Sequence, residues 1–338
     1  MTSMEIVLTS LAFIVSALLA GVMGFAIQRG ATCTVAAMDE IVSKRRFHRL
    51  ASMVEASAWV AGGLLIAQTL HLLGKMPAGY APSYATVLGG MLLGLGAYVN
   101  RACVFGAIAL LGSGQWAYVL TPVGFYAGCV TFPYVFHVAA QEKLPYGSPV
   151  LQASSWVAVV FIGFVSWRLA RPLFALNSGS SSATIWARLR DGIATRVWSS
   201  HAATTVIGIA FLFMLLLVGA WAYTDVLSEL AHGMANNLVA RGLLLVALFL
   251  GALWGGWTAG RFRSTRASLV QLLKCFVGGL MMGWGSLLIP GGNDGLILVG
   301  MPLLWPYAWI AFLTMCACIG TALLAENMLA DAVGVRSA

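Results

Sequence analysis

Long uncharged apolar runs alternate with short polar segments along the whole chain. A helix needs roughly 20 apolar residues to cross about 30 Å of hydrocarbon, and nine runs come close to that length. The runs are Ile6–Ile27, Ala56–Leu73, Tyr84–Val99, Ala117–Ala140, Val150–Trp167, Ala202–Tyr223, Gly242–Gly260, Leu269–Ile289 and Tyr307–Ala325. The pattern predicts an all-α polytopic membrane protein with about nine transmembrane helices, whose surroundings are the lipid bilayer.

The composition excludes a water-soluble fold. Of the 338 residues, 60% are hydrophobic and only 9% are charged, and the mean hydropathy is +0.89. A soluble domain could not bury so much apolar surface. The prediction of a membrane protein therefore rests on the composition as well as on the pattern.

Lysine and arginine gather in the connections that follow the first, third, fifth, seventh and ninth runs. Because connections rich in these residues stay in the cytoplasm, we expect the N-terminus outside and the C-terminus inside. The same rule accounts for the net charge of +8, so this charge does not indicate nucleic acid as a partner.

One longer polar segment divides the chain into halves. We expect an N-terminal membrane half at residues 1–167, a cytoplasmic linker at residues 168–200 and a C-terminal membrane half at residues 201–338. Within the linker, Ile185–Trp198 mixes basic and apolar residues and is typical of an amphipathic helix at the membrane surface. A docking site for another protein is the alternative.

The two halves share a pattern of glycines. Gly90, Gly94, Gly96, Cys103 and Gly106 match Gly279, Gly283, Gly285, Gly292 and Gly295 at an offset of 189 residues. Gly24–Gly30 matches Gly256–Phe262 at an offset of 232, and Ala56–Leu73 fills the difference as one inserted span. An odd number of inserted spans makes the copies inverted, which is a recurring plan of transporters. Glycines placed for helix packing are the alternative.

Three segments are too apolar for exposed loops and too short to span: Gln28–Met38, Asn100–Gly112 and Ile289–Gly300. We expect re-entrant half-helices whose N-terminal ends lie inside the protein. The free N–H groups and the positive end of the helix dipole at such ends form an anion site.

Of the six cysteines, only Cys33 and Cys103 begin such broken segments. A thiol at a helix N-terminus is well placed to interact with a sulphur compound, and simple packing is the alternative. The chain has no Cys-x-x-Cys pair or Cys/His spacing of a zinc site, and neither His-Glu-x-x-His nor Gly-x-Ser-x-Gly occurs. We therefore expect no metal, no cofactor and no enzymatic activity.

At these residues the chain resembles the YeeE/YedE family of membrane proteins, which includes bacterial thiosulfate transporters. The resemblance rests on GFAIQRGATC, GLGAYVNRACVFG, the late GRFR and GGLMMGWGSLLIPGG, and it covers nearly the whole chain. It implies an hourglass of inverted repeats in the bacterial inner membrane, with a narrow centre that is lined by cysteines. Cys33 and Cys103 match two of these pore cysteines. The third pore cysteine that the family implies is absent, because this chain has Gly292 in its late turn.

The same turn offers Asn293 and Asp294 to a substrate. Asp294 either faces the pore, where its charge would repel an anion, or caps a helix. Arg29, Arg101 and Arg261 are candidates for binding an anion. For Arg29 and Arg261, anchoring at the membrane surface is the alternative.

These features favour a transporter or facilitator for a small sulphur-containing anion, with thiosulfate as the first candidate. The alternative is a membrane sulphur relay, in which a cysteine persulfide is handed to a cytoplasmic sulphur-carrier protein. A structural subunit without a substrate is a third reading.

Overall fold

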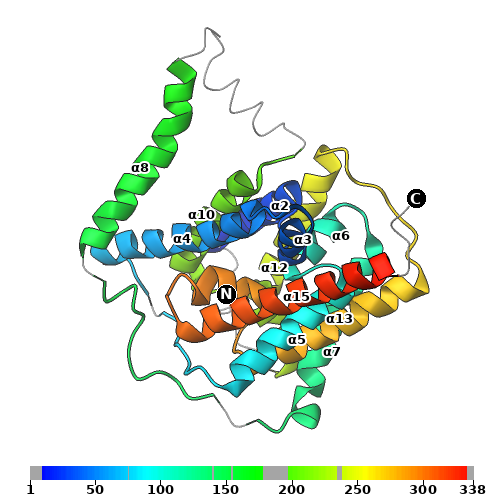
Figure 1. Cartoon of the computed structure of the whole chain (residues 1–338). Coiled ribbons are helices and arrows are strands. Elements are labelled where there is room, and N and C mark those ends of the chain that lie inside the picture. Colours follow the sequence, from blue (N-terminus) through cyan, green and yellow to red (C-terminus); the bar gives the residue numbers. More distant parts are fainter. Residues whose placement is uncertain are drawn as a thin grey trace.

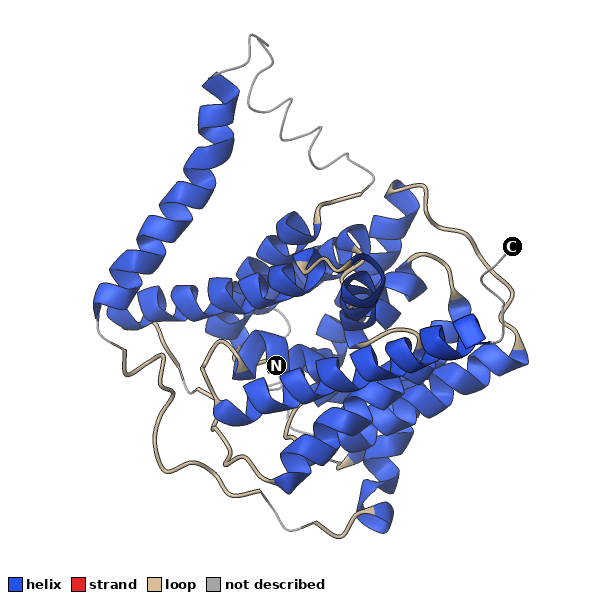
Figure 2. Ribbon diagram, in the orientation of Figure 1, coloured by secondary structure: helices blue, strands red, loops and turns tan. Residues whose placement is uncertain are grey.

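The computed structural model describes residues 10–74, 76–138, 141–153, 155–177, 197–233 and 238–332, and within these ranges it is all-helical (Figures 1 and 2). No sheet forms in this part of the chain. Two isolated bridges join connections, one between Tyr80 and Lys143 and one between Gln115 and Thr265.

The described chain contains long helices and short helices. The long helices are α2 (Leu11–Gly30), α4 (His48–Thr69), α5 (Tyr84–Asn100), α7 (Leu120–Val135), α8 (Ser155–Asn177), α10 (Ser200–Val218), α12 (Leu238–Thr258), α13 (Leu269–Leu288) and α15 (Pro306–Ala332). The short helices are α3 (Thr34–Lys44), α6 (Val104–Gly112), η1 (Trp116–Val119), α11 (Tyr223–Ala231) and α14 (Asn293–Gly295), which continues into the π-helical turn η2 (Leu296–Gly300).

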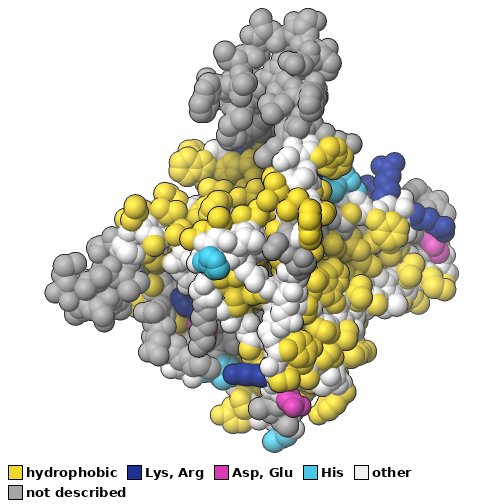
Figure 3. Space-filling model, turned by 90° about the vertical axis from the view of Figure 1, so that its left-hand side faces the viewer, with side chains coloured by type: hydrophobic (Ala, Val, Ile, Leu, Met, Phe, Trp, Pro, Cys, Tyr) yellow, Lys and Arg dark blue, Asp and Glu magenta, His cyan; other side chains and the backbone are white. Residues whose placement is uncertain are grey.

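Seven stretches of the described chain are long and apolar enough to cross a membrane. They are Leu11–Lys44, His48–Thr69, Tyr84–Gly112, Ser200–Val218, Leu238–Thr258, Leu269–Leu288 and Pro306–Ala332. Hydrophobic side chains also cover much of the face seen in Figure 3. The chain is therefore a multi-pass membrane protein.

Each of the nine predicted runs overlaps one long helix, but two of these helices fall short of a full span. Helix α7 has 16 residues, and the apolar part of α8 is Trp156–Arg168. Helix α8 stands at the edge of the bundle in Figure 1 and packs on α4, where Phe161 and Phe164 contact Trp59. The predicted amphipathic stretch lies almost entirely outside the described residues.

Serine side chains fix the starts of three long helices. The hydroxyl groups of Ser10, Ser199 and Ser268 each accept a hydrogen bond of 3.2 Å from the backbone N–H three residues later. This side-chain bond satisfies one of the donors that the first turn of a helix leaves free.

The order of elements repeats as long helix, short helix, long helix. Four such units follow one another: α2-α3-α4, α5-α6-α7, α10-α11-α12 and α13-α14/η2-α15. Helices α2 and α10 begin 189 residues apart, as do α3 and α11, and α6 and α14. A single offset therefore relates the halves, and the match of Gly24–Gly30 with Gly256–Phe262 is wrong as a repeat because α2 corresponds to α10 and not to α12. The span at Ala56–Leu73 is then no insertion.

Helix packing follows the same repeat. Helices α2, α4, α10 and α12 form one group and α5, α7, α13 and α15 form the other, with α2 on α10 and α5 on α13. If each helix is replaced by its equivalent in the other half, the contact of α2 with α12 becomes the contact of α10 with α4, which is also present. In the same way, the contact of α13 with α7 becomes that of α5 with α15, and the contact of α3 with α15 becomes that of α11 with α7. This is the contact pattern of two repeats related by a twofold axis.

Glycines allow the helices of each group to approach closely. A Cβ atom at Gly251 would lie 1.9 Å from the carbonyl oxygen of Gly21, so the backbones of α12 and α2 touch there. By contrast, a Cβ atom at Gly242, nine residues earlier on the same helix, would meet nothing within 4 Å.

We expect Gly251→Ala to destabilise the protein and Gly242→Ala to leave it as stable as the wild type or more so. The first change forces α2 and α12 apart, and overpacking of this kind typically costs about 1–3 kcal/mol. The second change only improves helix propensity. The thermal unfolding midpoints of the two purified variants in detergent test this, and equal midpoints would contradict the packing.

Candidate functional site

The N-terminal ends of four short helices lie inside the protein. Their N-cap residues are Cys33 for α3, Cys103 for α6, Ala222 for α11 and Gly292 for α14. Each has an extended backbone, and none caps its own helix with its side chain. The N–H groups of these first turns therefore need acceptors from elsewhere in the fold. The sequence predicted three of these ends and missed α11.

The first two ends meet in the thiol cluster, which consists of Cys33, Thr34 and Cys103. The backbone N–H of Thr34 donates a hydrogen bond to Cys103 Sγ at 3.1 Å. The Cys33 thiol lies beside that of Cys103, and both cysteines are free. Cys103 is fully buried, while Cys33 is partly exposed. The structure thus brings the two predicted cysteines together.

Gly106 creates the space for the Cys33 thiol. A Cβ atom at this position would lie 2.5 Å from Cys33 Sγ. A glycine in the first turn of α6 is therefore required by the side chain that begins α3.

Asn293 connects the thiol cluster with the late turn. Its Nδ2 atom lies 3.4 Å from the hydroxyl oxygen of Thr34, and its side chain is fully buried. Its Oδ1 atom has no hydrogen-bond partner among the described residues. This amide therefore joins the predicted third broken segment to the two cysteines.

Asp294 forms the carboxylate cluster with Thr224 and Gly292. One carboxylate oxygen accepts a hydrogen bond of 3.2 Å from the backbone N–H of Thr224, and the other accepts one from the Thr224 hydroxyl. The aspartate is 2% exposed. The predicted cap is thus present, but it caps the first turn of α11, a different helix from its own. Its negative charge lies at the positive end of the α11 dipole, which compensates it locally.

The carboxylate cluster explains why residue 292 is glycine. A Cβ atom at Gly292 would lie 2.4 Å from the hydroxyl oxygen of Thr224. A cysteine in that backbone position would collide with the threonine that holds Asp294.

The three predicted arginines do not gather at the cysteines. Arg29 is buried, donates a hydrogen bond of 2.8 Å to Thr258 and lies over the ring of Phe25 at 4.8 Å. Arg101 forms an ion pair of 2.5 Å with Glu326 at the end of α15. Arg261 is exposed in the turn after α12. The buried position of Arg29 does not match an anchor at the membrane surface, and the anion-binding role of the three arginines stays a prediction.

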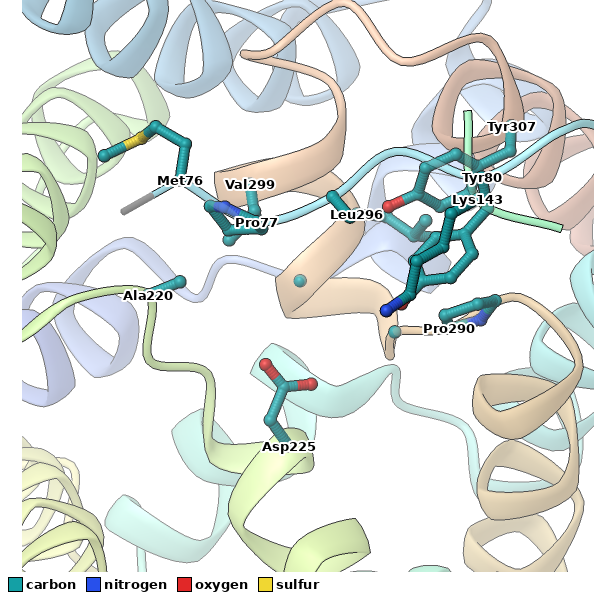
Figure 4. Close-up of a pocket in the computed structure, with 13 residues that line it drawn as sticks. Met76, Pro77, Tyr80, Lys143, Ala220, Asp225, Pro290, Leu296, Val299 and Tyr307 are labelled. Carbon is teal, nitrogen blue, oxygen red and sulfur yellow. The ribbon is translucent and has the colours of Figure 1, made fainter. Parts of the chain in front are cut away.

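Cavities lie on both sides of the clusters. Beside Cys33, a space of about 10 Å³, roughly the room of one water molecule, is lined by Ala31, Thr32, Cys33, Arg49, Ser52, Met53 and Ser200. A second space of about 10 Å³ adjoins Asp294, Tyr223 and Phe105. A third and larger cavity of about 530 Å³ is lined by Asp225 and Lys143, among others (Figure 4).

Sequence reasoning missed Arg49, Lys143, Thr224 and Asp225 as residues near the site. Arg49 belongs to a basic segment that the positive-inside rule accounted for, and Lys143 was a single charge in a predicted outer connection, so nothing local marked either residue. No group of three or more metal-ligating side chains occurs in the described ranges.

The fold and the site define a class of protein. Membrane proteins with repeated units and interrupted helices, whose ends meet at buried polar groups, are typically transporters. The model of the sulphur transport family matches residues 29–323, and the chain belongs to this family. This match confirms the resemblance to the YeeE/YedE proteins. Among the curated proteins, none matches the chain.

We expect Thr224→Val to destabilise the protein. The change removes the hydroxyl that donates to Asp294, so one buried carboxylate oxygen loses this hydrogen bond. Losses of this kind cost about 1–3 kcal/mol. Thr205→Val is the matched control, since the hydroxyl of Thr205 donates to the carbonyl of His201 within its own helix. Thermal unfolding of both variants gives the comparison, and a Thr224→Val midpoint as high as that of the control would contradict the cap.

Proposed function

We propose that this protein is a transporter or facilitator for a small sulphur-containing anion, with thiosulfate as the first candidate. The observation that carries the proposal is the meeting of Cys33, Cys103 and Asn293 at the ends of three short helices, between a cavity on each side. We further propose that the protein lies in a bacterial inner membrane with its N-terminus outside and its C-terminus in the cytoplasm.

The chemistry of the thiol cluster suits the charge and the polarisability of thiosulfate. Its two negative charges favour the N–H groups and dipoles at helix starts. Its terminal sulphur is large and polarisable, and thiol groups are weak hydrogen-bond donors of similar character. Passage through a pore requires binding that is favourable enough for the anion to enter and weak enough for it to leave. Weak S–H contacts meet both requirements.

The twofold contact pattern supports the hourglass of inverted repeats that the resemblance implies. With α2 beginning outside, the thiol cluster would open toward the cytoplasm and the carboxylate cluster toward the outside. In this orientation Arg49, which lines the cavity beside Cys33, supplies a positive charge where the anion leaves. Arg49 would thereby take the anion-binding role that was predicted for Arg29, Arg101 and Arg261.

The second candidate function is the sulphur relay, which the partial exposure of Cys33 favours. The Cys33 thiolate would attack the terminal sulphur of thiosulfate, forming a sulphur–sulphur bond while sulfite leaves with the electron pair. A thiolate of a cytoplasmic carrier protein would then take the terminal sulphur of this persulfide and release the Cys33 thiolate.

We expect Cys103→Ala and Cys33→Ala each to reduce uptake of labelled thiosulfate to background in cells that lack their own sulphur importers. Removing either thiol removes a contact at the constriction. Cys129→Ala is the control, because Cys129 is buried between α7 and α13 with its sulphur 4.0 Å from the carbonyl oxygen of Gly283. Membrane levels of all three variants are measured in parallel.

Full uptake by the Cys33→Ala, Cys103→Ala double variant would overturn the transport role of the thiols. Mass spectrometry of the wild-type protein after exposure to thiosulfate separates the two functions. A gain of one sulphur atom on Cys33 indicates the relay, and unchanged masses together with uptake indicate non-covalent passage.

A further inference from the structure

A large cavity with charged residues in its wall lies next to the carboxylate cluster, on the side that is predicted to face outside. This cavity of about 530 Å³, here called the vestibule, lies between the connections around Tyr80, Lys143 and Pro290, the start of α11 and the turn η2 (Figure 4). Tyr307 at the start of α15 completes its wall. It has room for an anion of a few heavy atoms together with water.

The vestibule leads toward the buried site. Gly295 and Asp225 line it, and a Cβ atom at Gly295 would lie 3.9 Å from Asp225 Oδ1. Asp294 is the residue next to Gly295, and Asn293, which contacts Thr34, is one residue further. Because Asp225 lines the vestibule and Asp294 and Asn293 do not, an anion moving from the vestibule toward Cys103 would meet Asp225 first.

The backbone of Lys143 is held in place, while its ammonium group forms no ion pair with Asp225. The connection around Lys143 forms an isolated bridge with Tyr80, with backbone hydrogen bonds of 2.9 Å from Ala81 N to Glu142 O and from Leu144 N to Gly79 O. Lys143 and Asp225 both line the vestibule, yet they form no ion pair within the described residues. An ammonium group beside a cavity is suited to bind an anion there.

We propose that the vestibule is an anion site of its own, in which Lys143 binds the incoming sulphur anion and Asp225 takes up a proton when the anion is bound. This inference rests on the proposed function. The proton comes from solvent in the vestibule and adds to a carboxylate oxygen of Asp225, so each bound dianion carries with it one positive charge. Anion binding and protonation then favour each other by linkage.

The surroundings of Asp225 favour such a change of charge. Helix α11 lies outside the membrane-spanning helices, and burial, followed by the nearby Asp294, raises the pKa of the Asp225 carboxyl to about 7, while Arg241 acts in the opposite direction. The charge of Arg241 is shared with Glu229 in an ion pair of 2.8 Å. The titratable groups that face Asp225 or its helix are Asp294 from α14, Arg241 from α12, Tyr307 from α15, Cys129 from α7, Glu229 on α11 itself and Lys143 across the vestibule.

The sign of the pH dependence follows from this arrangement. Below about pH 7 the carboxyl of Asp225 is protonated and neutral, so it does not oppose an anion beside Lys143. Above that pH the ionised carboxylate repels the anion. We therefore expect the KM for thiosulfate to rise as the pH increases from 6 to 8, by about tenfold for a like charge acting across a partly screened cavity.

The experiment is exchange of labelled thiosulfate by the full-length protein in liposomes that have the same buffer inside and outside, at pH values from 5.5 to 8.5. Asp225→Asn should give a KM that stays low at all pH values. Lys143→Gln should raise the KM about tenfold at pH 6, and Lys143→Arg should restore it. Glu142→Gln is the control, since Glu142 lies in the same connection but does not line the vestibule.

The outcomes separate this inference from the proposed function. Two results would overturn the vestibule site and leave transport standing. In the first, the KM of Asp225→Asn shows the same pH dependence as that of the wild type. In the second, the KM of Lys143→Gln equals that of the wild type. Absence of thiosulfate exchange by the wild type at every pH would overturn the proposed substrate and the vestibule site together.

Discussion

Four short helices begin inside this protein, and the need to satisfy their first N–H groups governs the site. Such groups have no acceptor in their own helix and cannot reach water when they are buried. In the first half, the thiol of Cys103 accepts from the backbone N–H of Thr34. In the second half, the carboxylate of Asp294 accepts a hydrogen bond from the backbone N–H of Thr224. The same requirement is thus met by a side chain of the neighbouring short helix in each half, with sulphur in one and oxygen in the other.

The long helices were predictable because apolar runs of near-spanning length leave few alternatives. Helix α11 was missed since Asp225 and Glu229 give its nine residues the composition of a polar loop. The two-offset alignment failed for a different reason. Gly24 and Gly256 lie on helices that pack on each other, where a Cβ atom at Gly24 would lie 1.9 Å from the carbonyl oxygen of Leu248. Their likeness reflects shared packing demands and does not indicate equivalent positions in a repeat.

The candidate site was predictable as far as local sequence controls it. Cys33, Cys103 and Gly292 could be found because each lies in a short break between apolar runs, and the structure places all three at helix starts. Partners distant in sequence carried no such signal. Thr224 is 70 residues from Asp294, and Glu326 is 225 residues from Arg101. Whether a charged side chain faces a pore, a helix end or an ion-pair partner is decided by these long-range contacts.

The glycine at position 292 and the aspartate at position 294 belong to one arrangement. The resemblance to sulphur transporters implies a third cysteine in this turn. In the repeat, this cysteine would occupy the position that is equivalent to Cys103. Here Thr224 occupies the space that its Cβ would need, and Thr224 is there to hold Asp294. The turn therefore has the hydroxyl of Thr224 and the carboxylate of Asp294 where the resemblance implies a thiol. A backbone with twofold repeats thus acquires chemically different ends, with thiols at one and oxygen groups at the other.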